Sequence, residues 1–126
     1  MLRPQCSFVL EVVLKYVELL PRADARRLLW RLTKGYTHIE SNAVGRLITL
    51  RPDIVGEREI ERTFHLWVVS CREQGNPDPA TRDAIGALAD RLSRKQIGVI
   101  EKVVKQGCCE QARDLLRRLH MLGKYP

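Results

Sequence analysis

The chain has 126 residues, of which 44% are hydrophobic and 29% charged, and its formal net charge is +7. This composition excludes a disordered chain and predicts one folded domain over residues 1–126. The excess of Lys and Arg favours an anionic partner, either nucleic acid or an acidic protein surface.

Apolar residues recur at helical spacing along nearly the whole chain, and no segment shows the alternation typical of a half-buried strand. Helices are expected over residues 7–20, 21–35, 37–50, 56–74, 79–92, 93–106 and 108–122. Short loops between them indicate antiparallel packing of neighbours. The predicted fold is therefore all-α, a compact antiparallel bundle of six or seven helices.

Local signals mark the ends of several of these helices. Thr37 and Glu40 have the spacing of a capping box, and Ser93 is a suitable N-cap. Asp78 precedes a proline at the first position of the next helix. Gly107 is a suitable helix end. These signals predict four helix ends, which belong to three of the helices.

Two helices show a clear apolar stripe that we expect to face the core. The stripe of the first helix consists of Phe8, Val12, Tyr16 and Leu19. The stripe of the fourth helix consists of Ile60, Phe64, Trp67, Val68 and Cys71. Trp30 in the second helix is also expected in the core.

Two segments near opposite ends of the chain have nearly the same sequence. Residues 25–32 (ARRLLWRL) are echoed by residues 112–119 (ARDLLRRL), at an offset of 87. Solenoid repeats have shorter periods, roughly 20–50 residues. We therefore interpret the echo as two amphipathic helices built from the same helix formers, with basic residues on the outer face.

The charged residues provide the main functional signal. Basic residues share a face on the second helix and recur on the last one, whereas carboxylates gather at the start of the fourth. The predicted binding residues are Arg27, Arg31, Lys34, Arg113, Arg117, Arg118, Glu57 and Glu61. A solvated helix face is the alternative interpretation of these charges.

No catalytic, cofactor-binding or metal-binding motif is present in the sequence. The four cysteines lack the paired spacing of a zinc site, and Cys108 is adjacent to Cys109, a poor geometry for a mutual disulfide. Cys71 lies in an apolar run and is expected to be a buried, inert thiol. We therefore expect no enzyme, no cofactor, no metal and no structural disulfide.

The segment 64–75 (FHLWVVSCREQG) carries a resemblance to a known family. It is followed by residues at family spacing: Pro79, Ile85, Leu88, Leu92, Arg94 and Ile97. Together they resemble the later half of a death effector domain, and residues 8–29 are similar to its first two helices. The family's Arg-x-Asp-Leu-Leu motif corresponds here to residues 94–98 (RKQIG), which lack the acid. The resemblance implies a six-helix death fold that acts by homotypic interaction in signalling.

These observations predict a non-enzymatic protein–protein interaction module, an adaptor or regulator that acts through charged helix faces. Its expected partner is a protein, with homo-oligomers of the chain included. The alternative is a nucleic-acid-binding protein that contacts phosphates of double-stranded RNA or DNA through the same arginines. Glu11, Lys15 and Glu18 interrupt the longest apolar stretch, so no membrane partner is expected. The expected location is intracellular, in the cytoplasm or the nucleus.

Overall fold

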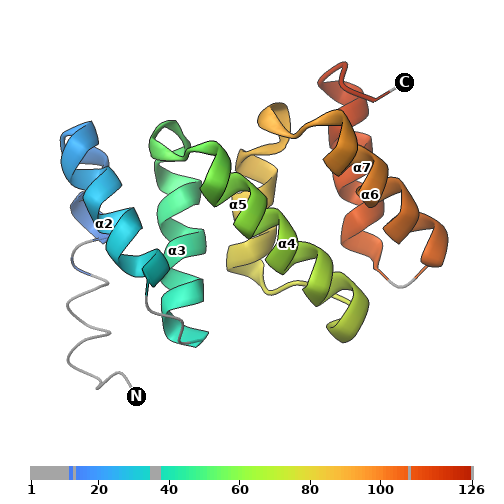
Figure 1. Ribbon diagram of the computed structural model, residues 1–126, viewed down its shortest axis with the longest axis horizontal. Helices are drawn as coiled ribbons and strands as arrows, with labels where there is room; N and C mark the ends of the chain where they lie inside the picture. The colour runs from blue at the N-terminus through green and yellow to red at the C-terminus, as the bar shows by residue number, and fades with distance from the viewer. Residues whose placement is uncertain (1–11, 13, 35–37, 108, 126) are drawn as a thin grey trace. The chain divides into compact units, whose positions relative to one another are not determined.

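The computed structural model describes residues 12, 14–34, 38–107 and 109–125 (Figure 1). They form the helices η1 (Val17–Leu19), α2 (Arg22–Lys34), α3 (His38–Leu50), η2 (Pro52–Ile54), α4 (Glu57–Gln74), α5 (Pro79–Ala87), η3 (Ala89–Arg91), α6 (Arg94–Gln106) and α7 (Glu110–Met121). The three labelled η are 3-10 helices. No strand occurs in this part of the chain, so the predicted all-α class is confirmed.

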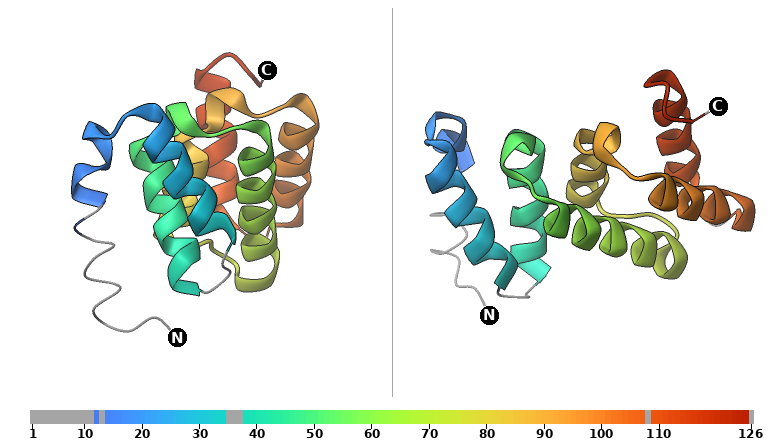
Figure 2. Two further views of the ribbon diagram at one scale, coloured as in Figure 1. Left: turned by 60° about the vertical axis from the view of Figure 1, so that its left-hand side comes forward. Right: turned by 45° about the horizontal axis from the view of Figure 1, so that its top comes forward.

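The α-helices pair as antiparallel hairpins, α2 with α3, α4 with α5 and α6 with α7 (Figures 1 and 2). The chain divides into two compact units, which we call unit 1 (residues 1–56) and unit 2 (residues 57–126). Within each hairpin the expected antiparallel packing of neighbours is present. The single domain over residues 1–126 stays a prediction.

The side chain of Arg51 donates hydrogen bonds to backbone carbonyl groups of unit 1. Its Nη1 donates to the carbonyl oxygens of Val17 (2.9 Å) and Leu20 (2.8 Å). Its Nε and Nη2 each donate to a carboxylate oxygen of Asp53, at 2.9 Å in both cases. The hydrogen bond from Arg51 lowers the pKa of Asp53, and the same bond raises the pKa of Arg51.

The stripe predicted for the first helix is wrong at the positions that the structure describes. Val12, Tyr16 and Leu19 are 39%, 59% and 80% exposed, whereas Leu14 and Val17 are buried. The segment closes as the 3-10 helix η1, in which residues three apart lie on one side. Leu14 precedes η1 in α-helical residues, and because residues three apart share a helix face, Leu14 and Val17 are buried together. Phe8 and the expected Thr37 cap lie outside the described residues.

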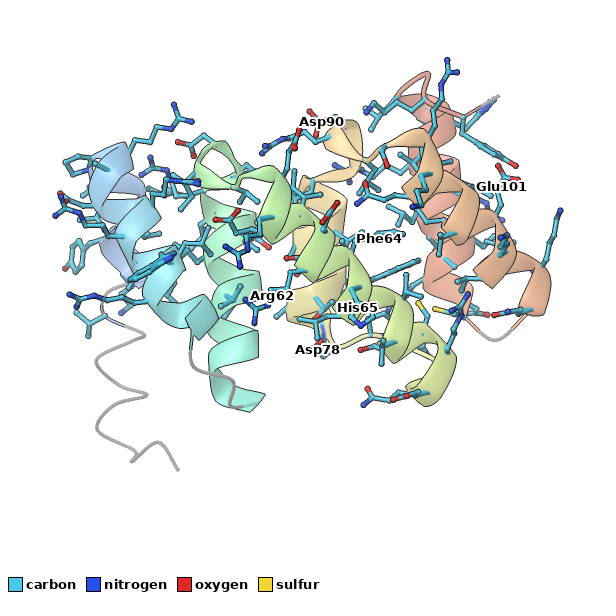
Figure 3. The ribbon with its side chains drawn as sticks, viewed as in Figure 1. Arg62, Phe64, His65, Asp78, Asp90 and Glu101 are labelled. Carbon is cyan, nitrogen blue, oxygen red and sulfur yellow. The ribbon has the colours of Figure 1, made fainter. Side chains whose placement is uncertain are left out.

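The stripe predicted for α4 is confirmed and forms the core of unit 2. Ile60, Phe64, Trp67, Val68 and Cys71 are all buried. The rings of Phe64 and Trp67 stack with centroids 6.0 Å apart and planes 24° apart. His65, the residue after Phe64, is exposed; Figure 3 labels both residues.

The helix ends of unit 2 largely follow the sequence signals. The Oγ of Ser93 accepts from the N–H of Gln96 (3.2 Å), and the side chain of Gln96 accepts from the N–H of Ser93 (2.8 Å). This reciprocal pair is a capping box. Gly107 ends α6 with φ of 70°, a left-handed conformation that favours glycine.

The fifth helix is shorter than the expected span of 79–92. Asp78 occupies its N-cap position, but only its backbone carbonyl accepts a bond, from the N–H of Arg82 (3.0 Å). At the other end, the N–H of Leu88 is shared by two carbonyls, those of Ala84 and Ile85, both at 3.1 Å. Such a shared bond marks a change to 3-10 geometry, and η3 follows directly.

The two echoing segments are not equivalent elements. Residues 25–32 lie in α2, the first helix of its hairpin, whereas residues 112–119 lie in α7, the second helix of its hairpin. An internal repeat would place its copies at the same position of successive hairpins. The echo therefore reflects similar amphipathic composition, as interpreted from the sequence.

Candidate interaction surfaces

A turn at the end of α7 folds the chain back on that helix. Gly123 has φ of 75°, and its N–H donates to the carbonyl of His120 at 3.0 Å. The N–H of Lys124 donates to the carbonyl of Leu119 at 2.9 Å. These two bonds make a Schellman motif, which satisfies the last carbonyls of α7 and reverses the chain.

Two side-chain contacts hold the segment after this turn. The Nδ1 of His120 lies 2.9 Å from the carbonyl oxygen of Tyr125. The Nζ of Lys124 donates to the carbonyl of Leu92 at 3.2 Å, which joins the segment to the end of η3. Tyr125 is thereby held beside the last turns of α7.

A groove of about 520 Å³ lies on the outer face of α7, and we call it the α7 groove. Its lining residues are Arg113, Leu116, Arg117, His120, Met121 and Tyr125. Residues 113, 116, 117 and 120 have the i, i+3, i+4, i+7 spacing of one helix face. The side chain of Met121 is 84% exposed. The groove surface is almost entirely apolar, so the arginines line it mainly with their aliphatic stems.

The arginines of α7 are exposed at the surface of unit 2. Arg117 approaches Asp114, with Nη1 3.7 Å from Oδ1, but both side chains are more than 70% exposed. Such an exposed pair is weak, so the guanidinium remains available to a partner. Arg118 reaches α5, where its Nη1 lies 3.9 Å from the position that a Cβ on Gly86 would take.

The predicted basic residues of the second helix belong to unit 1. Arg27 and Arg31 are exposed on α2, and Lys34 is its last residue. The expectation that Trp30 lies in the core is wrong, because its side chain is 55% exposed. The preceding residue, Leu29, takes the buried position, and successive residues of an α-helix point about 100° apart.

Carboxylates and arginines alternate at the start of α4. Glu57 and Glu61 are exposed and one turn apart, which places them on one face. Arg58 and Arg62 follow them directly and are exposed as well; Figure 3 labels Arg62. This surface is therefore mixed in charge rather than uniformly acidic.

Among the described residues, the structure brings only part of the predicted set together. Arg113 and Arg117 line one groove, with Arg118 on the same helix. Glu57 and Glu61 lie on α4 of unit 2, and the basic residues of α2 lie in unit 1.

Sequence reasoning missed the apolar half of the α7 groove. The buried stripe of α7 consists of Ala112, Leu115 and Leu119. Leu116, four residues after Ala112, lies at the half-buried edge of that stripe, and Met121 falls outside it. Large apolar residues at the edge of the buried stripe of an amphipathic helix, or outside it, are the signal by which the sequence could have indicated this groove.

Two cysteines that are far apart in sequence meet in unit 2. Cys71 is buried, as predicted, and its Sγ lies 2.9 Å from that of Cys109, which is also buried. Nothing in the spacing of the cysteines indicated this pair. Cys6 and Cys108 lie outside the described residues.

The residues that the structure describes contain no cluster of three His, Cys, Asp or Glu side chains that could hold a metal ion. None of their helices combines the length and apolar character needed to cross a membrane. The comparisons with known proteins give no match to a family model, a curated protein or a solved structure.

Proposed function

We propose that this chain is a non-enzymatic interaction module, an adaptor or regulator, whose α7 groove binds an acidic amphipathic helix of a partner protein. The observation that carries this proposal is the pairing of Arg113 and Arg117 with Leu116 and Met121 around one groove. The partner would bury apolar side chains between the arginines and present carboxylates to them.

The apolar groups favour a protein over a phosphate backbone. Met121 and Leu122 are 84% and 48% exposed, and large apolar side chains grouped at a surface are typical of interaction sites. The groove volume of about 520 Å³ is in the range of roughly 300–1,000 Å³ found for ligand pockets. Amphipathic helices dock in such grooves through apolar anchors spaced i, i+3 or i+4.

The charges favour an acidic partner. Arg113 and Arg117 are one turn apart on the same face, so their spacing matches Asp or Glu side chains one turn apart on a partner helix. A guanidinium binds a carboxylate through two parallel hydrogen bonds. The net charge of +7 also speeds encounter with an acidic surface.

A second copy of the chain is a less suitable partner. The resemblance to death effector domains implies homotypic association, and Glu57 and Glu61 supply carboxylates one turn apart. However, Arg58 and Arg62 lie beside them and would repel Arg113 and Arg117. We therefore propose a separate acidic helix, and we keep self-association as an outcome of the test.

The proposal can be tested with defined probes in solution. The first probe is a synthetic amphipathic helix with Leu at i and i+4 and Glu beside each; the second is a double-stranded RNA of similar net charge. Fluorescence anisotropy measures binding of each probe to the full chain at low and high salt. Light scattering on the chain alone measures self-association.

Two variants with a matched control decide the result. We expect Met121→Asp and the double change Arg113→Glu with Arg117→Glu each to weaken peptide binding about tenfold or more. The control variant Arg31→Glu changes an exposed arginine of α2 and should leave peptide binding unchanged. Equal loss with Arg31→Glu, or binding of RNA but not peptide, would overturn the proposal. If light scattering shows oligomers of the chain and Glu57→Lys abolishes them, self-association would replace the proposal of a separate acidic helix.

One observation favours a nucleic-acid function other than the predicted double-strand binding, namely the binding of single strands. Trp30 is 55% exposed and is next to Arg31 in sequence, with Arg27 one turn before. An aromatic ring beside arginines is typical of single-strand binding, where bases stack on the ring. If this face binds RNA, Trp30→Ala should weaken binding of a single-stranded oligonucleotide roughly fivefold or more and leave the acidic peptide unaffected.

A further inference from the structure

We propose that Cys71 and Cys109 are a redox-active pair that forms a reversible disulfide and clamps α7 to α4. The two residues are 38 positions apart, yet their Sγ atoms are separated by 2.9 Å. This site is independent of the α7 groove and of the partner proposed for it.

The distance between the sulfur atoms supports a covalent bond. Non-bonded atoms in protein interiors normally approach to about 3.5–4.0 Å for carbon, and sulfur is larger. The observed 2.9 Å is already closer than that. A disulfide has an S–S length of about 2.04 Å, so an approach of about 0.9 Å completes the bond.

A metal ion fits the pair less well. Two thiolates on one zinc ion, each with Zn–S of about 2.3 Å in tetrahedral geometry, would place the sulfurs about 3.8 Å apart. The observed separation is shorter by almost 1 Å. Among the described residues, no group of three His, Cys, Asp or Glu side chains that could hold a metal ion is present. The geometry therefore favours a bond between the sulfurs.

The backbone around the pair favours a clamp between two helices. Cys71 lies in the last turns of α4, and Cys109 is the N-cap residue of α7, with an extended backbone (φ −149°, ψ 114°). A link there would tie the start of α7 to the end of α4. Because it closes a loop of 38 residues, it would restrict the unfolded chain and stabilise unit 2.

The chemistry needs an oxidant, and we propose a peroxide. Cys109 is 7% exposed and Cys71 is fully buried, so a small peroxide reaches Cys109 first. Its thiolate attacks one oxygen of hydrogen peroxide, the O–O bond breaks, and sulfenic acid and water form. The sulfur of Cys71 then attacks the sulfenyl sulfur, and the hydroxyl leaves as a second water. Overall, two thiols and one hydrogen peroxide give one disulfide and two waters.

The test uses the full, reduced chain treated with hydrogen peroxide and then quenched and unfolded in acid. Alkylation of the unfolded protein counts the remaining thiols, and peptide mapping by mass spectrometry identifies the linked cysteines. We expect a Cys71–Cys109 peptide with a mass lower by two hydrogens than the sum of the separate peptides. Thermal unfolding should show Tm raised by roughly 10 °C, reversed by a thiol reductant.

Variants separate this pair from its neighbours. Cys108→Ser should leave both the linked peptide and the rise in Tm unchanged, whereas Cys109→Ser should abolish both. If Cys109→Ser folds poorly, the Cys108→Ser chain decides alone, because it retains both proposed sulfurs. Peroxide treatment that leaves Cys71 and Cys109 alkylatable, or that links Cys71 to Cys6 or Cys108, would overturn the proposal.

Discussion

The helices α2 and α7 share a sequence pattern but use their arginines differently. In each, the alanine that opens the shared segment, Ala25 or Ala112, is fully buried. The arginine after Ala25 is Arg26, whose Nη1 donates to the carbonyl of Ile54 within unit 1. The arginine after Ala112 is Arg113, which lines the α7 groove of unit 2.

The difference shows what an amphipathic pattern determines. The pattern decides which helix face is buried, because apolar burial drives the packing. The role of each guanidinium depends on the backbone nearby: in unit 1, η2 and the turn after η1 present carbonyls that need donors. Counting arginines on a helix face therefore does not separate those that hold the fold from those that can bind a partner.

The largest expected effect tests what the two helices have in common. Leu29 on α2 and Leu119 on α7 are both fully buried, so replacing either with Ala should lower the free energy of unfolding by about 3 kcal/mol. Met121→Ala, at an 84% exposed position, should change it by less than about 0.5 kcal/mol. Urea denaturation followed by circular dichroism measures all three. A similar loss for Met121→Ala would contradict the burial pattern.

A smaller effect should separate the structural arginines from the surface ones. Arg51→Ala removes donors from the carbonyls of Val17 and Leu20, and should clearly lower the free energy of unfolding. Arg117→Ala breaks only an exposed ion pair and should cost less than about 0.5 kcal/mol. Arg51→Lys keeps the positive charge but loses the planar guanidinium group with its several donors. Its loss of unfolding free energy should therefore lie between those of the two alanine variants. Equal losses for Arg51→Ala and Arg117→Ala in urea denaturation would remove the distinction.

The smallest expected effect concerns pH. Arg51 lowers the pKa of Asp53 in the folded state, so the carboxylate form stabilises unit 1 above the pKa of the unfolded chain. This contribution should disappear as pH falls from about 5 through the folded pKa. The effect is small because the Asp53 side chain is 52% exposed. Thermal unfolding against pH should therefore decline less steeply in Asp53→Asn, and Asp114→Asn on α7 serves as the control.

The sequence was sufficient to predict helix ends and a buried helix face where interactions within a few residues determine them. The reciprocal bonds of Ser93 and Gln96 and the left-handed Gly107 follow from residues within one turn. The buried face of α4 follows from strict helical spacing. Prediction failed at Tyr16, where the helix tightens into η1, and at Trp30, where two neighbouring apolar residues compete for one buried position.

The candidate sites depend on contacts between distant residues. Tyr125 lines the α7 groove because the chain folds back on α7. The turn at Gly123 and the hydrogen bond from Lys124 Nζ to the carbonyl of Leu92 hold the chain there. The pairing of Cys71 with Cys109 requires α4 and the start of α7 to meet. Periodicity along one helix carries no information on either arrangement, so sequence reasoning named two arginines that line the groove but did not predict the groove itself.

The two tryptophans provide separate optical reporters of the two units. Trp67 is 1% exposed and stacked on Phe64 in unit 2, whereas Trp30 is 55% exposed in unit 1. Emission from Trp67 should lie toward the blue and resist quenching by iodide, while emission from Trp30 should lie toward the red and be quenched. The emission of Trp67 can therefore follow the melting of unit 2 without any added dye, while that of Trp30 reports on the surface of α2.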